Sequence, residues 1–144
     1  MMMRIPLIIF AFLIVVVFSC SKSGGVADDG DGEDNHVVTP TDVTAPVITI
    51  SGPAAGQQFA SGSSRAVTGK ITDDYGLYRG NIRFVNDATG EVLKQQAYEI
   101  HGYMEYNYSL THVISAPGNY TATVAFEDHG LNSTSASVKF KVNP

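Results

Sequence analysis

The feature that most constrains this chain is a two-residue alternation of apolar and polar residues, which begins near Thr44 and continues almost to the C-terminus. In "GNYTATVAFED" the alternation puts Tyr120, Ala122, Val124 and Phe126 on one face. Such alternation is typical of a β-strand with one buried and one solvated face. No stretch repeats with the period of an α-helix over three turns. The sequence therefore predicts an all-β domain.

Turn residues divide the alternating region into seven expected strands. Their ranges are Pro46–Ser51, Arg65–Asp73, Tyr78–Val85, Glu91–Glu99, Met104–Ile114, Asn119–Glu127 and Ser133–Val142. Between two of them, "NDATGE" is expected to form a hairpin loop in which Gly90 takes a positive φ. Seven short strands separated by turns indicate a seven-stranded antiparallel β-sandwich.

The N-terminus, "MMMRIPLIIFAFLIVVVFSC", has one basic residue, Arg4, followed by the mostly apolar run Ile5–Phe18. As a helix this run would span only about 21 Å, which is short of the ~30 Å hydrocarbon core of a membrane. A short apolar run after a basic start predicts a secretory signal peptide, here residues 1–19. An uncleaved membrane anchor is the alternative.

The end of this run, "VFSC" (Val17–Cys20), resembles the lipobox of bacterial lipoproteins, with the small Ser19 directly before the only cysteine. The resemblance implies that Cys20 is the first mature residue and carries the lipid. Burial of acyl chains contributes about 0.8 kcal/mol per CH₂, so several chains give a durable membrane anchor. The expected partner is therefore a membrane, reached through the lipid on Cys20, and an unused buried thiol is the alternative.

Residues 20–43 are expected to form a flexible tether, because they are rich in Gly, Ser and Asp and have little apolar surface to bury. Five acids crowd this segment: Asp28, Asp29, Asp31, Glu33 and Asp34. The cluster resembles the acid-rich stretch after the lipidated cysteine in Bacteroidetes-type lipoproteins sent to the outer face, and a plain spacer is the alternative. The folded domain is then 44–144.

The charge of the chain argues against nucleic acid as a partner. The net charge is −5, but residues 44–144 carry eight acids and seven bases, so the expected domain is nearly neutral. Such a domain has no basic face to neutralise phosphates. Because Cys20 is the only cysteine, no intramolecular disulfide is possible and the core must hold by packing.

Three segments carry a family resemblance: "ISGPAAGQQFASG" (Ile50–Gly62), "GKITDDYGL" (Gly69–Leu77) and "GNYTATVAFEDHGLNSTSASVKFKV" (Gly118–Val142). They resemble bacterial immunoglobulin-like surface domains, and more narrowly the single-domain Bacteroidetes lipoproteins of unknown function. The resemblance implies an immunoglobulin-like sandwich with Tyr120 at the tyrosine corner. It also implies a lipid-anchored protein of the outer membrane, either periplasmic or surface-exposed.

Two segments, "DDYGL" (Asp73–Leu77) and "EDHGL" (Glu127–Leu131), each place two acids and a glycine after an expected strand. If successive strands reverse, the second and sixth run in the same direction and end at the same pole of the sandwich. Asp42 and His101 are expected at that pole as well. Four acids are the candidate ligands of a metal ion: Asp73, Asp74, Glu127 and Asp128.

Two interpretations of these acids remain. Asp and Asn close turns through hydrogen bonds to nearby backbone, with Gly76 and Gly130 supplying a positive φ, and this turn interpretation is favoured. The alternative is a Ca²⁺ site, because Ca²⁺ prefers about six to eight oxygen ligands. No other cofactor is expected.

An enzyme is not expected. The sequence lacks a nucleophile motif, and neighbouring acids such as Asp73 and Asp74 diverge along a strand rather than facing one bond. The expected function is that of a non-catalytic binding or structural interaction module, lipid-anchored at the cell surface, with a protein or glycan partner. The alternative is a glycan-binding accessory lipoprotein of a polysaccharide-uptake system, with Tyr75, Tyr78 and Tyr103 as an exposed aromatic platform.

Overall fold

The computed structural model describes residues 37–144. The expected signal peptide (1–19), the lipidated Cys20 and the tether up to residue 36 lie outside the described residues, so these remain predictions. Residues 37–144 are built from strands and connecting loops, and they include no helix long and apolar enough to span a membrane.

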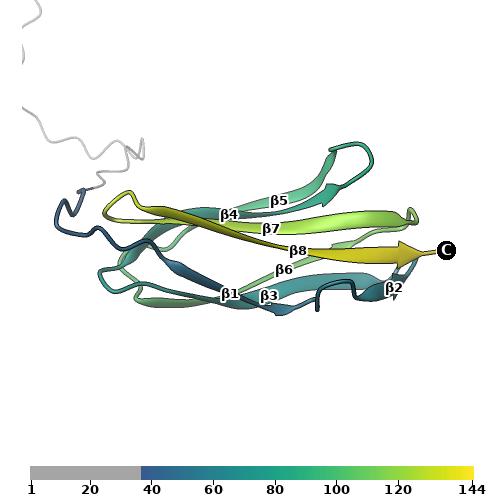
Figure 1. Ribbon diagram of the computed structural model, residues 1–144, viewed down its shortest axis with the longest axis horizontal. Coiled ribbons are helices and arrows are strands. Elements are labelled where there is room, and N and C mark those ends of the chain that lie inside the picture. The colour runs from purple at the N-terminus through teal and green to yellow at the C-terminus, as the bar shows by residue number, and fades with distance from the viewer. Residues whose placement is uncertain (1–36) are drawn as a thin grey trace, which may run out of the picture. The chain divides into compact units, whose positions relative to one another are not determined.

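The described residues form two facing β-sheets (Figure 1). The strands are β1 (Val47–Gly52), β2 (Gln58–Ala60), β3 (Ser64–Thr72), β4 (Leu77–Asn86), β5 (Val92–Glu99), β6 (Glu105–Val113), β7 (Gly118–Asp128) and β8 (Ser133–Asn143). One sheet has the order β1-β3-β6 and the other β2-β8-β7-β4-β5. The predicted β-sandwich is confirmed, and each of its seven predicted strands is found within one residue at both ends. An additional short strand, β2, was not predicted, and it pairs parallel with β8.

The strand order is that of an immunoglobulin-like sandwich. Lettered along the chain as A, A′, B, C, C′, E, F and G, the strands give the sheets A-B-E and A′-G-F-C-C′. The expected tyrosine corner is also present, because the buried Tyr120 donates its hydroxyl to the carbonyl of Ala116 at 2.8 Å. The chain therefore has an immunoglobulin-like fold held without a disulfide.

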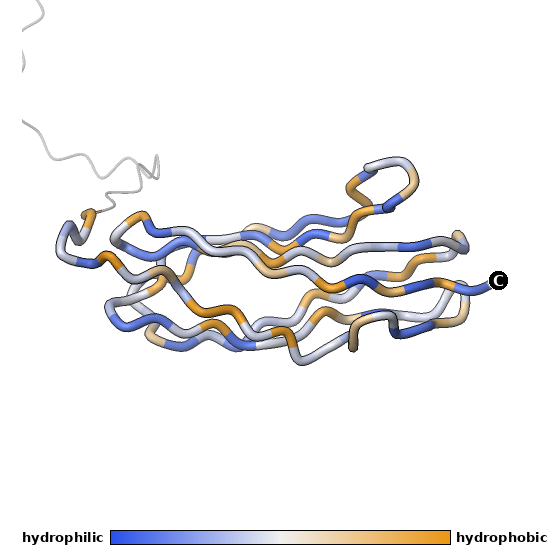
Figure 2. The backbone as a smooth tube through the Cα atoms, in the orientation of Figure 1, coloured by the Kyte–Doolittle hydropathy of each residue, from blue (hydrophilic) through white to orange (hydrophobic). Residues whose placement is uncertain are grey.

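The core lies between the two sheets and follows the predicted alternation. Hydrophobic and hydrophilic positions alternate along the strands (Figure 2). On β7 the four expected inward residues are all buried: Tyr120, Ala122, Val124 and Phe126. Burial of a side chain such as Val124 or Phe126 contributes about 1.5–3 kcal/mol, so the inward face of β7 helps to drive folding.

Four loop segments meet at one end of the sandwich, opposite the end where the C-terminus lies (Figure 1). This end, here called the acidic pole, comprises residues 39–45, 73–76, 100–104 and 128–132. Backbone hydrogen bonds join the segments, among them Thr39 N to His129 O at 2.8 Å and His129 N to Gly76 O at 3.1 Å. The ordered body therefore includes Thr39 and Asp42, which precede the expected domain start at Thr44.

Candidate functional site

Three aspartates from three separate segments converge at the acidic pole. Asp42 precedes β1, Asp73 follows β3, and Asp128 ends β7. One carboxylate oxygen from each residue lies within 4.8 Å of those from the other two. Asp42 is 3% exposed, Asp128 is fully buried and Asp73 is half-buried. The structure thus brings together two of the four candidate ligands, Asp73 and Asp128, and adds Asp42.

Asp73 closes the turn between β3 and β4. Its Oδ2 accepts the backbone N–H groups of Tyr75 at 3.0 Å and Gly76 at 2.6 Å. Gly76 has a φ of 136°, which favours glycine. The turn interpretation therefore describes how this loop is held, but it uses only one of the two carboxylate oxygens.

Asp128 is held by Asn132 in the turn between β7 and β8. Its Oδ1 accepts Asn132 N at 2.8 Å and its Oδ2 accepts Asn132 Nδ2 at 3.0 Å. The expectation that Gly130 supplies a positive φ is wrong, because the residue with φ of 66° is Leu131. Gly130 is needed for space instead: a Cβ there would lie 2.6 Å from the carbonyl oxygen of Asp42.

Asp42 is the most constrained of the three acids. Its Oδ1 accepts Thr44 N at 3.1 Å, whereas its Oδ2 is buried without a hydrogen-bond partner among the described residues. Burial raises the pKa of the Asp42 carboxyl, the hydrogen bond from Thr44 opposes this, and the charges of Asp128, Asp73 and Asp74 raise the pKa further. The folded protein thus disfavours the charge of Asp42 in the absence of a cation.

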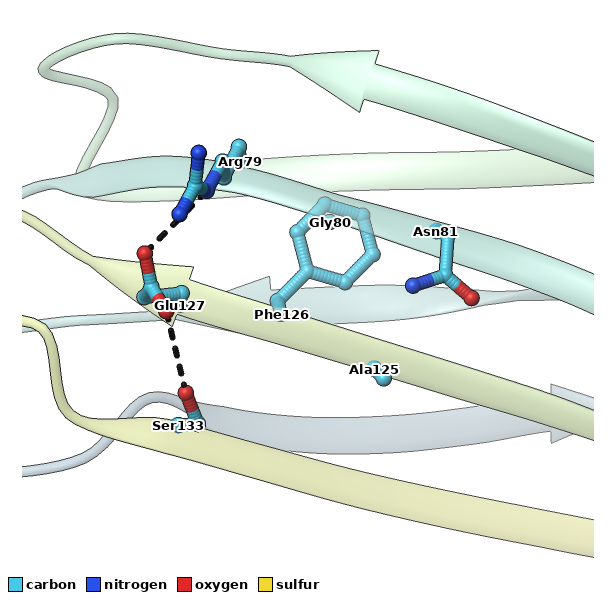
Figure 3. Close-up of a pocket in the computed structure, with 7 residues that line it drawn as sticks. All are labelled: Arg79, Gly80, Asn81, Ala125, Phe126, Glu127 and Ser133. Carbon is cyan, nitrogen blue, oxygen red and sulfur yellow. Dashed lines mark hydrogen bonds and ion pairs between the residues drawn. The ribbon is translucent and has the colours of Figure 1, made fainter.

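Asp74 and Glu127 lie outside this group of three. Asp74 is exposed. Glu127 points from the outer face of the five-stranded sheet, where its Oε1 accepts Arg79 Nε at 3.2 Å and its Oε2 accepts Ser133 Oγ at 3.3 Å. Figure 3 shows these contacts at the edge of a shallow hollow over Gly80. Glu127 precedes the inward Asp128 on the same strand, and neighbouring side chains of a strand face opposite ways.

The three candidate tyrosines do not form one platform. Tyr75 is 55% exposed and Tyr103 is 59% exposed, but Tyr78 is 3% exposed. The ring of Tyr78 packs against His101 and His129 at centroid distances of 4.9 and 5.3 Å. The expectation that Tyr78 offers an exposed ring is therefore wrong, because the two histidines enclose it.

Large apolar side chains are exposed around the three aspartates. They come from all the loop segments of the acidic pole and are each between 48% and 83% exposed: Val43, Tyr75, Tyr103, Met104 and Leu131. Periodicity could not identify this set, because the residues lie in loops where the alternation is interrupted. Their common location follows only from the pairing of the strands that they connect.

Comparisons with known proteins give only distant likenesses. No protein-family model matches this sequence, and none of the curated proteins does either. Among solved structures, the chain is similar to fibronectin(III)-like modules of Clostridium thermocellum CbhA, at 21% identity over 70% of this chain and 48% of that chain, with a TM-score of 0.46. This chain thus spans about half the length of that structure.

Two further solved structures have a comparable likeness. The sulfur carrier protein SoxY from Chlorobium limicola f thiosulfatophilum is 20% identical over 70% of this chain and 81% of that chain, with a TM-score of 0.44. The superoxide reductase (neelaredoxin) from Ignicoccus hospitalis is 14% identical over 69% of this chain and 81% of that chain, also with a TM-score of 0.44.

Proposed function

We propose that this chain is a lipid-anchored protein of the bacterial outer membrane, exposed at the cell surface, whose sandwich is a non-catalytic binding or structural interaction module. The observation that carries the proposal is the set of exposed apolar side chains on the loops of the acidic pole, led by Tyr75 and Tyr103. Large apolar residues that gather at one place on a soluble domain are typical of contact surfaces. The lipobox-like segment before Cys20 supports the anchor.

The polar groups of the pole support a non-catalytic role. General acid–base catalysis needs side chains positioned to exchange protons with a substrate. Here Asp73 accepts hydrogen bonds from its own turn, and Asp128 accepts them from Asn132. These carboxylates thus hold loops in place, which suits a rigid contact surface.

The anchor can be tested by labelling the full-length chain with a palmitate analogue in a bacterial host. We expect the wild-type protein to be labelled and to sediment with membranes, and Cys20→Ser to lose the label. Ser21→Ala, which changes the neighbouring residue, is the control and should behave like wild type. An unlabelled wild-type protein would contradict the anchor.

The contact surface can be tested by photo-crosslinking in intact cells, with a benzophenone amino acid placed at Tyr75 or Tyr103. The control position is Val92, which is 45% exposed but lies at the far end of β5 from the acidic pole. We expect a discrete adduct from position 75 or 103 and none from 92. Absence of an adduct at both pole positions would refute the proposed contact surface.

A second candidate function is glycan binding, which the exposure of Tyr75 and Tyr103 favours. Their loops are joined by a hydrogen bond from Leu77 N to Tyr103 O at 2.9 Å, so the two residues lie at the same pole. Exposed aromatic rings offer flat apolar faces on which sugar rings can stack. Affinity electrophoresis against polysaccharides should show retardation that Tyr75→Ala with Tyr103→Ala abolishes and Val92→Ala preserves. Unretarded wild-type protein would exclude this candidate for the polysaccharides used.

A further inference from the structure

Two buried carboxylate oxygens at the acidic pole, Asp42 Oδ2 and Asp73 Oδ1, accept no hydrogen bond from any described residue. Only 3% of Asp42 is exposed, so the residue is 97% buried. Buried polar atoms in folded proteins almost always have a partner, and each exception requires an explanation. The orphaned oxygens belong to two members of one group, which also includes Asp128.

No lysine or arginine of the described residues forms an ion pair with this group. Ion pairs of lysine and arginine in residues 37–144 are made with Glu105, Glu127 and Asp87, and none involves Asp42, Asp73 or Asp128. Three carboxylates with oxygens within 4.8 Å of one another repel when all are ionised. A positive charge between them would remove the repulsion and satisfy the two orphaned oxygens.

We propose that Asp42, Asp73 and Asp128 bind one divalent cation, and that this cation is Ca²⁺. Two oxygens that bind the same Ca²⁺ ion, each at about 2.4 Å, lie at most about 4.8 Å from each other. One carboxylate oxygen from each of the three aspartates lies within 4.8 Å of the other two, so all three can bind the same ion. Three carboxylates supply between three and six of the roughly six to eight oxygens that Ca²⁺ takes. Asp73 also lines a surface hollow, together with Thr44 and Ala45.

The site would fasten the segment before β1 to the sandwich. Asp42 lies in the segment that leads from the expected tether, whereas Asp73 and Asp128 lie in the β3–β4 and β7–β8 turns. Hydrogen bonds from Thr39 and Asn132 already join the segment before β1 to the β7–β8 turn. An ion bound by all three aspartates would add a further connection between these segments. Ca²⁺ therefore sets the rigidity of the junction between tether and domain, and this inference does not depend on the identity of any partner.

The first test is thermal unfolding of the full-length chain, purified in detergent, with 1 mM CaCl₂ and with a chelator. If the dissociation constant is about 0.1 mM, as in extracellular calcium modules, the unfolding temperature should rise by about 5–10 °C. Unchanged unfolding at 10 mM CaCl₂ would overturn the proposal. An equal rise with MgCl₂ alone would overturn the assignment to Ca²⁺.

Asp42→Asn is the decisive variant, because Asn keeps an oxygen to accept the Thr44 N–H, removes the charge and puts an amide nitrogen in place of the orphaned oxygen. We expect Asp42→Asn to lose the response to Ca²⁺ and to unfold in chelator no earlier than wild type. Asp74→Asn is the matched control: it removes a charge from the exposed neighbour in the same loop and should respond like wild type. If Ca²⁺ raised the unfolding temperature of Asp42→Asn as much as that of wild type, the proposed site would be refuted.

Hydrogen exchange of the wild-type protein gives a readout that does not depend on any variant folding. Ca²⁺ should slow exchange at the amides of Thr39, Asp42 and Thr44, since these N–H groups donate bonds that hold the segment before β1. Amides at the far end of the sandwich, such as Ser61, should change less. Equal exchange at Thr39, Asp42 and Thr44 with and without Ca²⁺ would refute the role of the ion at the junction.

Discussion

At the scale of single residues, Tyr108 links three strands of the smaller sheet. The side chain is 3% exposed, and its hydroxyl donates to the carbonyl of Thr49 in β1 at 3.1 Å. The ring occupies the space in which a Cβ at Gly69 of β3 would lie. Position 69 therefore requires glycine, because any larger residue would clash with the ring of Tyr108. The ring can then lie over β3 and reach β1.

Tyr108 predicts an alkaline limit to stability, because burial raises its pKa from 10.0 to about 12. Its contribution is fully present below the pKa of an unfolded tyrosine and is lost as the pH rises through about 12. Urea unfolding of the full-length chain between pH 8 and 12 should show this loss. Tyr108→Phe should lower the free energy of unfolding at pH 8 by about 1 kcal/mol and flatten the alkaline decline.

The control for this prediction is Tyr75→Phe, which changes an exposed tyrosine and should leave both the stability at pH 8 and the alkaline decline unchanged. An alkaline decline in Tyr108→Phe as steep as in wild type would assign the titration to another group, with the half-buried Tyr98 as the next candidate because its pKa is also raised by burial.

The acids of the pole show which part of the site was predictable from sequence. Reversal of successive strands places Asp73 and Asp128 at the same end, and this needs only the strand ranges. Glu127 lies apart from this group because β7 extends through Asp128, so the two neighbours face opposite sides of the sheet. The burial of Asp42 depends on contacts with Gly130 and Asn132, which no local pattern reveals.

At the scale of elements, the turn between β7 and β8 contains a strained residue. Leu131 has a φ of 66°, in the left-handed region that costs a residue with a Cβ about 1–2 kcal/mol, and it is 48% exposed. The N–H of Leu131 donates to the carbonyl of Asp128 at 3.2 Å. The turn that positions Asp128 therefore also keeps Leu131 in its strained conformation.

Leu131→Gly should raise the free energy of unfolding by about 0.5–1 kcal/mol, which is the left-handed penalty less the added chain entropy of glycine. Leu131→Ala removes the same side chain but keeps the penalty, so it should not show this gain. Urea unfolding of both variants separates the two effects. Equal stability of the Gly and Ala variants would mean that the turn relaxes at little cost.

The short strand β2 shows where sequence reasoning fails at this scale. Alternation predicted the long strands because each exposes one face and buries the other. β2 has only three residues, too few for a period to emerge, and it pairs with β8 from a distant part of the chain. Its position depends on Arg65, which is 2% exposed, donates to the carbonyls of Ala60 and Ser63, and lies 5.2 Å from the ring centroid of Phe59.

Arg65→Ala should therefore release β2 and lower the free energy of unfolding by roughly 2–4 kcal/mol, since it removes a large buried side chain and the charged donor of the Ala60 and Ser63 carbonyls. Arg83→Ala, which removes an exposed arginine from β4, should change the stability by less than about 0.5 kcal/mol. Hydrogen exchange at Ser61, whose N–H donates to Asn143 O at 3.0 Å, should also accelerate in Arg65→Ala alone. Unchanged exchange at Ser61 would show that other contacts hold β2.

At the scale of the whole molecule, the chain enters and leaves the sandwich at opposite ends. The first described residues enter at the acidic pole, and the C-terminus leaves at the other end (Figure 1). A strand of 11 residues such as β7 is about 37 Å long. Under the proposed anchor, the expected tether joins the sandwich at the acidic pole. A lipid on Cys20 would thus keep the acidic pole near the membrane.

If Cys20 carries the proposed lipid, the orientation of the sandwich on the membrane can be measured by energy transfer to acceptor-labelled lipids. Cys20 is the only cysteine and would be blocked by its lipid, so Leu131→Cys or Val92→Cys each adds one free thiol for a donor dye. The two positions are similarly exposed, 48% and 45%, but lie at opposite ends of the sandwich. Transfer should be higher from position 131, because the tether joins the acidic pole. Equal transfer from both positions would mean that the domain tumbles freely, and the exposed side chains of the pole would then face partners in solution as readily as partners in the membrane.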